Sequence, residues 1–195
     1  MQNIDDFIPA AAAQYCQDLI SRHKFKLILT KERQTKLGDF RRDKYNNYTI
    51  TVNRTLNPFQ FLITFIHEYA HLLVAVGHPK SVKAHGKEWK NTFKELMLPI
   101  LNPQVFPDQV LRPLANHMRN PKAASASDPR LWQALKEFSP NASGITLEDI
   151  APGDKFLFKK RWFVKVSKRR TRVLCQEISS GKQYLIPAVA DVNQA

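Results

Sequence analysis

The sequence predicts an α+β fold, with a helix-containing N-terminal domain followed by a small β-barrel-like module. Apolar residues keep helical spacing along a segment at 59–76, and shorter segments of alternating polarity precede it. From Pro152 onward, apolar residues recur at every second position, as they do in strands. A stretch rich in proline, alanine and serine at 120–129 separates the two patterns and is typical of a linker.

In the N-terminal part, the pattern predicts a helix at 9–23, where a run of alanines favours helix formation. Strands are expected at 25–29 and 45–52, because polar and apolar residues alternate there. The polar stretch 31–44 between them is compatible with another strand or with a hairpin loop.

The central helix is expected at about 59–76. Asn57 is a suitable N-cap, Pro58 fits the first turn, and Gly77 suits the position after the last turn. The segment is apolar nearly all round, so we expect it to be buried. Further helices are expected at 87–98, 108–118 and 131–138, and strands at 155–159, 162–167, 171–177 and 183–186.

These patterns divide the chain of 195 residues into three parts. We expect a first domain at 1–120, a linker segment with a short helix at 121–150, and a basic β-rich module at 151–195. The length is sufficient for one compact domain with a small appended module, and insufficient for two large domains.

The composition is strongly basic, with 30 Lys and Arg against 17 Asp and Glu and a net charge of +13. Such a charge attracts polyanions, nucleic acid among them. Cys16 and Cys175 form no C-x-x-C pair, which excludes a cysteine zinc ribbon and makes a disulfide framework a poor interpretation. The start of the chain lacks the basic residues of a signal peptide, and the apolar stretches are shorter than a membrane span. We therefore expect an intracellular protein with no membrane partner.

The central helix contains the motif His67-Glu68-Tyr69-Ala70-His71. Residues four apart share one helix face, so both imidazoles can reach a single ion, and zinc suits imidazole ligands. Glu68 stands beside the first ligand, where its carboxylate can act as general base and then as general acid. The alternative is an ordinary pair of helix histidines with a solvated glutamate. Burial of such groups without partners would cost several kcal/mol, which favours the metal site.

A catalytic zinc takes three protein ligands and leaves one position for water, so a third ligand is needed. Gly77 stands where the long metzincin motif requires a histidine, which excludes that class. Four residues remain as candidates on spacing alone: His78, His85, Glu88 and Glu95. Gly86 lets the backbone pass close to the site next to His85.

The combination of His67-Glu68-x-x-His71 with His85-Gly86-x-x-Trp89 resembles the SprT-like metalloprotease family. The strand ending Ile50-Thr51-Val52-Asn53 ahead of the helix is also similar, and the likeness covers roughly residues 5–118. The resemblance implies a zincin-like protease domain with a central HExxH helix and His85 as the third zinc ligand. Spartan-type relatives act on DNA–protein crosslinks. Many bacterial members carry a four-cysteine zinc ribbon that this chain cannot form, so their mode of DNA binding is not carried over.

The C-terminal module holds nine basic side chains and no acidic one between residues 155 and 172. Positive charge on a sheet with aromatic residues suits contacts to phosphates and stacking on bases. We predict sequence-independent DNA binding by Lys159, Lys160, Arg161, Lys165, Lys168, Arg169, Arg170 and Arg172. The alternative is a solvated basic face. We expect the interleaved apolar residues to form the core of the module: Phe156, Phe158, Trp162, Val164 and Val166.

The sequence therefore predicts a zinc endopeptidase acting on proteins bound to DNA, with a cytoplasmic or nucleoid-associated location. Two alternatives are a general intracellular zinc protease without DNA dependence and a non-catalytic DNA-binding protein with structural zinc. His23 and His117 lack sequence partners and are expected at the surface, and Tyr69 is assigned no role.

Overall fold

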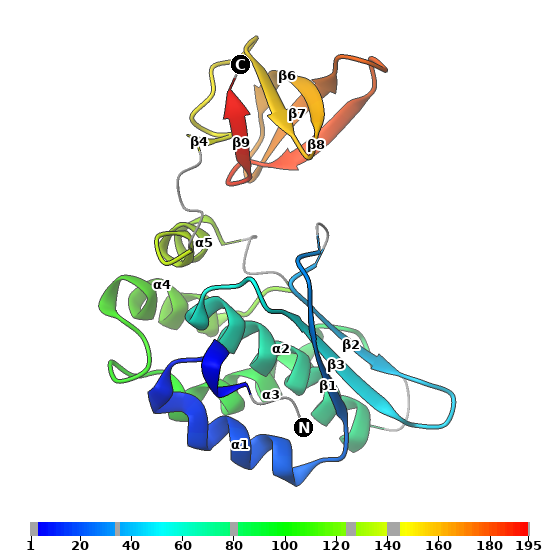
Figure 1. Cartoon of the computed structure of the whole chain (residues 1–195), viewed down its shortest axis with the longest axis vertical. Coiled ribbons are helices and arrows are strands. Elements are labelled where there is room, and N and C mark those ends of the chain that lie inside the picture. Colours follow the sequence, from blue (N-terminus) through cyan, green and yellow to red (C-terminus); the bar gives the residue numbers. More distant parts are fainter. Residues whose placement is uncertain (1–3, 34–35, 79–81, 124–127, 140–144, 195) are drawn as a thin grey trace. The chain divides into compact units, whose positions relative to one another are not determined.

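The computed structural model describes residues 4–33, 36–78, 82–123, 128–139 and 145–194. The chain is a mixture of helices and strands that forms two compact units, residues 1–123 and 124–195 (Figure 1). The division between them falls inside the segment 121–150 that the sequence predicts to be a linker.

The N-terminal unit contains the sheet and most of the helices. Its α-helices are α1 (Ala13–Arg22), α2 (Pro58–Gly77), α3 (Lys87–Met97) and α4 (Asp108–Arg119). Short 3-10 helices lie at Asp5–Phe7, Ala10–Ala12 and Leu98–Ile100. Its strands are β1 (Lys26–Thr30), β2 (Gly38–Arg42) and β3 (Tyr48–Asn53).

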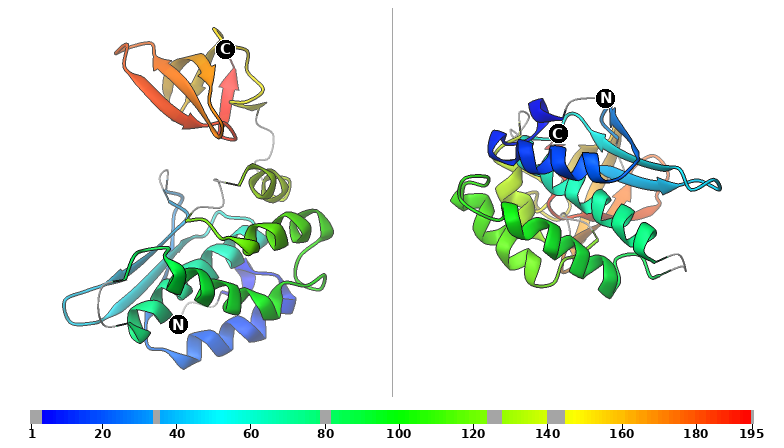
Figure 2. Two further views of the ribbon diagram at one scale, coloured as in Figure 1. Left: turned by 180° about the vertical axis from the view of Figure 1, so that it is seen from behind. Right: turned by 90° about the horizontal axis from the view of Figure 1, so that it is seen from below.

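The three strands form one sheet in the order β1-β3-β2. β1 is parallel to β3, and β2 is antiparallel to it, so the polar stretch 31–44 contains a strand. Ile50 and Val52 of β3 are fully buried. Helix α2 packs against β2 and β3 and also against α3 (Figures 1 and 2). The sheet therefore positions one flank of α2, and α3 positions another.

Helix α2 begins as the sequence predicts, and it extends through Gly77, which was expected just after its last turn. The Asn57 side chain accepts a hydrogen bond from the backbone N–H of Gln60 at 2.9 Å, and Pro58 occupies the first turn. Among the described residues, α2 is the one helix long and apolar enough to cross a membrane, and 67% of its most apolar window is buried. Such burial is typical of the core helix of a globular protein.

The C-terminal unit combines one helix with one sheet. Its elements are α5 (Pro129–Lys136), β4 (Ile145–Thr146), β5 (Lys155–Phe158), β6 (Arg161–Lys168), β7 (Arg172–Glu177), β8 (Gln183–Pro187) and β9 (Asp191–Gln194). All pairings in this sheet are antiparallel, in the order β4-β9-β5-β6-β7-β8. Closure of this sheet into a barrel stays a prediction.

Helix α5 lies in this second unit, and Leu131 and Leu135 on its apolar face are buried. The indole Nε1–H of Trp132 donates to the carbonyl of Val189 at 3.1 Å, and Lys136 forms an ion pair with Asp191. A segment that looks like a linker by composition thus holds a helix that packs in a folded unit.

The expected core of the module is partly wrong on β6. Phe156 of β5 pairs with Phe163 of β6, and both are buried. Because side chains alternate along a strand, Trp162 and Val166 point to the other face, where they are 45% and 40% exposed. Trp162 and Phe163 are both large and apolar but lie on opposite faces of β6. The sequence pattern therefore allowed either face to be inside, and the face with Trp162 was the wrong one.

Lys165 follows Phe163 on the inner face and is only 4% exposed. Its ammonium donates to the carbonyls of Leu147 and Glu148 at 3.0 Å each, and also to the carbonyl of Ile150. The long side chain thus satisfies three backbone acceptors in the segment after β4. Lys165 is therefore removed from the set of exposed basic residues predicted to contact DNA.

Replacing Lys165 with methionine is expected to destabilise the C-terminal unit by roughly 2–4 kcal/mol, because three carbonyls lose their donor in a buried setting. Urea unfolding of the full chain measures the change. Lys155→Met, on the exposed face of the adjacent strand β5, is the matched control and should stay close to the parent. Equal midpoints for the two variants would contradict the structural role of Lys165.

Candidate metal centre

Three histidines meet at one point of the N-terminal unit. His67 and His71 lie one turn apart on α2, and His85 comes from the segment that leads into α3. The Nε2 atom of His85 lies 3.1 Å from Nε2 of His67 and 3.0 Å from Nε2 of His71. One ligand atom from each of the three residues lies within 4.8 Å of the others. The three residues form a group that can hold a metal ion.

Residues 83–86 form a tight turn that brings His85 to the helix. His85 has φ 57°, in the left-handed region that side chains rarely adopt. The N–H of Gly86 donates to the carbonyl of Lys83 at 2.8 Å. A Cβ at Gly86 would lie 2.8 Å from that same oxygen, so glycine is required for this close approach. The backbone conformation of His85 and Gly86 thus orients the third imidazole.

Trp89 forms the wall behind the three imidazoles. Its indole is buried, and its ring centroid lies 4.6 Å from those of His67 and His85 and 5.4 Å from that of His71. Its Nε1–H donates to the carbonyl of His67 at 3.3 Å. Trp89, on the first turn of α3, therefore fixes the positions of the three imidazole rings.

The donor set fits a zinc ion. Zn–N bonds of 2.0–2.1 Å place two ligand nitrogens of a tetrahedral ion roughly 3.3 Å apart, close to the two observed separations. Burial first, and the neighbouring histidines second, lower the pKa of His67 to about 3; burial first and His85 second lower the pKa of His71 to about 4. Burial also lowers the pKa of His85. The rings are therefore neutral at pH 7, which is the form that binds metal.

The other candidate ligands do not join this group among the described residues. His78, Glu88 and Glu95 are not part of the cluster, and His78 and Glu95 are exposed. Three protein ligands leave a coordination position for water or substrate. This is the composition of catalytic zinc sites, whereas structural sites are closed by four protein ligands.

Glu68 lies between the two helix histidines in sequence and is directed at strand β2. It is 8% exposed, and burial raises its pKa to about 8, with Asp39 adding to the rise and Arg33 opposing it. The backbone N–H of Phe40 donates to its carboxylate. The backbone N–H of Asn53 on β3 donates to the carbonyl of Leu37, and backbone groups of successive residues along a strand point to opposite sides. Phe40, three positions after Leu37, therefore directs its N–H to the edge of β2 that faces away from β3. The carboxylate is therefore held at that edge.

Asn53 explains why the start of β2 is fixed. Its buried amide donates to the carbonyl of Lys36 at 3.0 Å and accepts from Nε of Arg33 at 2.8 Å and from the hydroxyl of Thr30 at 3.0 Å. The amide at the end of β3 thus ties down the segment that leads into Gly38. This gives a physical role to the asparagine that ends the strand ahead of the motif helix.

Gly38 of β2 faces Glu68 and was not predicted from the sequence. A Cβ at Gly38 would lie 2.7 Å from Glu68 Oε1 and 2.7 Å from Cγ2 of Thr64. We expect Gly38→Ala to push the carboxylate aside and to lower kcat about 100-fold, because misplacement by about 1 Å has this effect. Zinc stoichiometry and KM should change little, which separates displacement of Glu68 from loss of the site.

The matched control for Gly38→Ala is Gly77→Ala at the end of α2, where an added Cβ has no atom within 4 Å and φ is not positive. Steady-state kinetics with metal analysis would compare the two variants. If both retained the parental kcat, Gly38 would have no part in holding Glu68.

A cavity of about 360 Å³ opens beside the histidines. His71 and His85 form part of its wall, and Arg42 and Lys83 are its charged lining residues. The rest of the lining is mainly apolar: Phe40, Val74, Ala75, Val82, Ala84 and Trp89, with His78.

Two histidines expected at the surface have other positions. The Tyr69 hydroxyl donates to the carbonyl of Leu19 at 2.7 Å, so Nδ1–H of His23, 2.7 Å away, must donate to the Tyr69 oxygen. This chain of bonds ties α1 to α2 and gives Tyr69 a structural role. His117 is buried on α4. The expectation for His23 and His117 is corrected: long-range packing supplies contacts that local sequence does not show.

The basic residues of the C-terminal unit divide into two groups. Arg161 forms an ion pair with Glu177, and Lys168 forms one with Glu148. The Arg161 guanidinium also lies 4.7 Å from the centre of the Tyr184 ring. Exposed at turns or strand ends are Lys159, Lys160, Arg169, Arg170 and Arg172. The turns, more than the strand interiors, present accessible positive charge.

Two imidazoles one helical turn apart, a third from the following segment and a buried carboxylate define a candidate metal-dependent hydrolase site. A family model described as the SprT-like family matches residues 6–106, just over half of the chain. The chain belongs to the SprT-like family, which is generally a family of zinc metalloproteases. No curated protein and no solved structure matches the chain.

Proposed function

We propose that this chain is a zinc-dependent endopeptidase that acts on DNA-associated proteins, as in the processing of DNA–protein crosslinks. The observation that carries the catalytic part is Glu68, which follows the candidate ligand His67 on α2 and is buried with its carboxylate at the edge of β2. A purely structural zinc site has no use for such a carboxylate. Membership of the SprT-like family supports the same reaction class and a zincin-like domain.

Zinc held by His67, His71 and His85 would polarise a peptide carbonyl and lower the pKa of a bound water. The positive charge of a zinc ion at the histidines would favour the ionised form of Glu68 against the effect of burial. In that form Glu68 would take the proton from the attacking water and then give it to the leaving amine. The N–H of Phe40 orients the carboxylate, and Gly38 leaves room for it. The cavity next to His71 and His85 accepts a substrate side chain. Trp89 keeps the imidazoles in place and closes one side of the site.

The part of the proposal that concerns DNA rests on the C-terminal unit. Its exposed turn residues Lys159, Lys160, Arg169 and Arg170 carry charge that complements a phosphate backbone. The unit contains no cysteine ribbon, so it would hold the enzyme near DNA by a different surface from that of ribbon-bearing members. The proposed location is intracellular, either cytoplasmic or associated with the nucleoid.

The experiment is cleavage of a DNA-binding protein by the zinc-loaded full chain, with and without single-stranded DNA, over a range of salt concentrations. We expect DNA to stimulate cleavage and salt to remove the stimulation, because phosphate contacts release counterions. Cleavage that is indifferent to DNA and salt would favour a general intracellular protease. Zinc binding without cleavage under any condition would favour a non-catalytic DNA-binding protein.

A further inference from the structure

The hairpin between β5 and β6 has an unusual turn. Phe158 and Arg161 form the last cross-strand pair, so the loop consists of Lys159 and Lys160 alone. Both have positive φ, 51° and 64°, as a type I′ turn requires. Asn-Gly is the favoured pair for this turn, because both central residues adopt a conformation that is unfavourable for residues with large side chains. The chain places two lysines where another pair would fold better.

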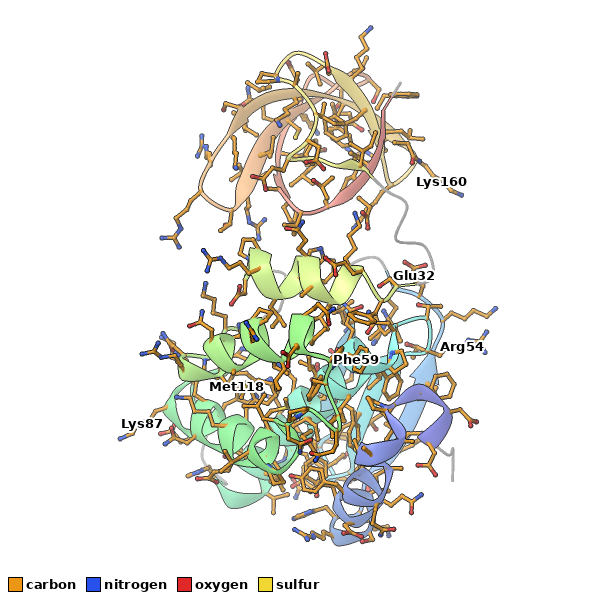
Figure 3. All side chains as sticks on the ribbon, turned by 90° about the vertical axis from the view of Figure 1, so that its left-hand side faces the viewer. Glu32, Arg54, Phe59, Lys87, Met118 and Lys160 are labelled. Atoms are coloured by element: carbon orange, nitrogen blue, oxygen red, sulfur yellow. The ribbon has the colours of Figure 1, made fainter. Side chains whose placement is uncertain are left out.

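Electrostatic repulsion makes this choice more unfavourable. Lys159, Lys160 and Arg161 are three consecutive cations, and no acidic residue lies between residues 155 and 172. The Lys159 ammonium lies 5.2 Å from the centre of the Phe158 ring, and Arg161 is paired with Glu177. Lys160 is exposed and projects away from the ribbon (Figure 3). Residues in rarely populated backbone conformations cluster at active sites and ligand-binding sites, where the strain serves the function.

An apolar patch adjoins this turn on the outer face of the sheet. Trp162 is the second residue of β6, and its side chain is 45% exposed. Its cross-strand partner on β5 is the half-buried Leu157, and its carbonyl accepts from the N–H of Ile178, whose side chain is also exposed. An indole on an open sheet face, a few residues from two turn lysines, offers a flat stacking surface next to positive charge.

We propose that Lys159, Lys160 and Trp162 form a binding site for single-stranded nucleic acid, in which the two lysines contact phosphates and the indole stacks on an unpaired base. The charge of the turn selects a polyanion, and the exposed aromatic face selects one that presents free bases. A duplex offers phosphates but keeps its bases stacked inside. This proposal specifies the class of nucleic acid that the proposed function involves. It rests on the proposed function in that respect only.

The test uses the full chain carrying Glu68→Gln, so that binding is measured without cleavage, and a fluorescent single strand of roughly 15 nucleotides. Lys159→Asn combined with Lys160→Gly installs the favoured turn pair. We expect this double variant to be more stable to heat by a few degrees, and yet to bind the single strand about 10-fold more weakly at 0.1 M salt. The slope of log K against log salt should become shallower by roughly 1.4, for two lost phosphate contacts.

A purely structural turn would not separate stability from binding in this way. The charge-matched control replaces two exposed lysines elsewhere, Lys24→Asn with Lys182→Asn, and should retain most of the affinity. If the control and the turn variant lost affinity equally, binding would be a diffuse effect of net charge and the proposed site would be overturned.

Trp162 is tested separately. Trp162→Ala should weaken binding about 10-fold, Trp162→Phe should restore most of it, and stacking should quench the Trp162 fluorescence of the parent. Unchanged binding by Trp162→Ala, or equally tight binding of a duplex, would overturn the stacking role. Parallel titrations with deoxy and ribo strands of the same sequence would identify which nucleic acid binds best, and a preference for either supports the site.

The partner class has its own control. If polyglutamate or vesicles of anionic phospholipid bound as tightly as the single strand, and lost binding in the same turn variant, the ligand would be an acidic protein or a membrane surface instead. Failure of these binding tests in a chain that still cleaves proteins would remove this site and leave the protease proposal in place. A chain that binds single strands through the turn but cleaves no protein would keep this site and remove the protease proposal.

Discussion

Replacing Glu68 with glutamine is expected to lower the turnover number for peptide cleavage about 10³-fold and to leave zinc binding at one ion per chain. The amide has nearly the same shape as the carboxylate, and its oxygen can still accept the hydrogen bond from the Phe40 N–H. It cannot take a proton from water. The three imidazoles are untouched by this change, so metal content and thermal stability should match the parent.

Steady-state cleavage of an unfolded protein substrate, together with metal analysis of the same samples, measures both quantities. Glu95→Gln is the matched control, because Glu95 is an exposed carboxylate on the neighbouring helix α3. It should retain parental turnover. A Glu68→Gln enzyme that cleaves as fast as the parent would show that another group activates the water.

The second large effect concerns His85. His85→Ala should weaken zinc binding at least about 100-fold, since two imidazoles on one helix cannot complete a catalytic zinc site. The variant should also lose the rise in thermal midpoint that zinc gives to the parent, because a ligand that binds the folded state stabilises it by mass action. Competition against a chromophoric chelator gives the affinity, and thermal unfolding with and without zinc gives the stabilisation.

His78→Ala provides the comparison, because His78 follows α2 directly but is exposed and outside the three-histidine group. It should bind zinc as the parent does. If instead His78→Ala lost zinc and His85→Ala kept it, the third ligand would be wrongly assigned.

Much of the metal centre could be predicted because its signals are local. The i, i+4 spacing puts His67 and His71 on one face of α2 whatever the rest of the chain does. The cap at Asn57 and the apolar run fixed the bounds of that helix to within a residue or two. His85 is different: a ligand delivered by a separate turn has no spacing rule, and chemistry alone left three other candidates open. The family resemblance selected it, and the geometry of the turn at Gly86 shows how it arrives.

Residues that act through tertiary contacts could not be found in this way. Gly38 matters because an added Cβ would lie 2.7 Å from a side chain thirty positions away, and nothing in its sequence neighbourhood indicates that partner. Lys165 lies in a basic run and looks like its neighbours, yet it is buried and bonded to three carbonyls. The sequence was equally ambiguous about which face of β6 points to the core, because Trp162 and Phe163 each satisfy an alternating pattern.

The proposed activity of this chain is the hydrolysis of peptide bonds with a zinc ion at His67, His71 and His85. The most direct measurement is titration of zinc into metal-free protein, with cleavage products identified by mass spectrometry and substrates offered both free and bound to single-stranded DNA. We expect new peptide termini that increase in proportion to zinc and reach a plateau at one equivalent. Full occupancy of the site with no new termini from any substrate, free or DNA-bound, would contradict it.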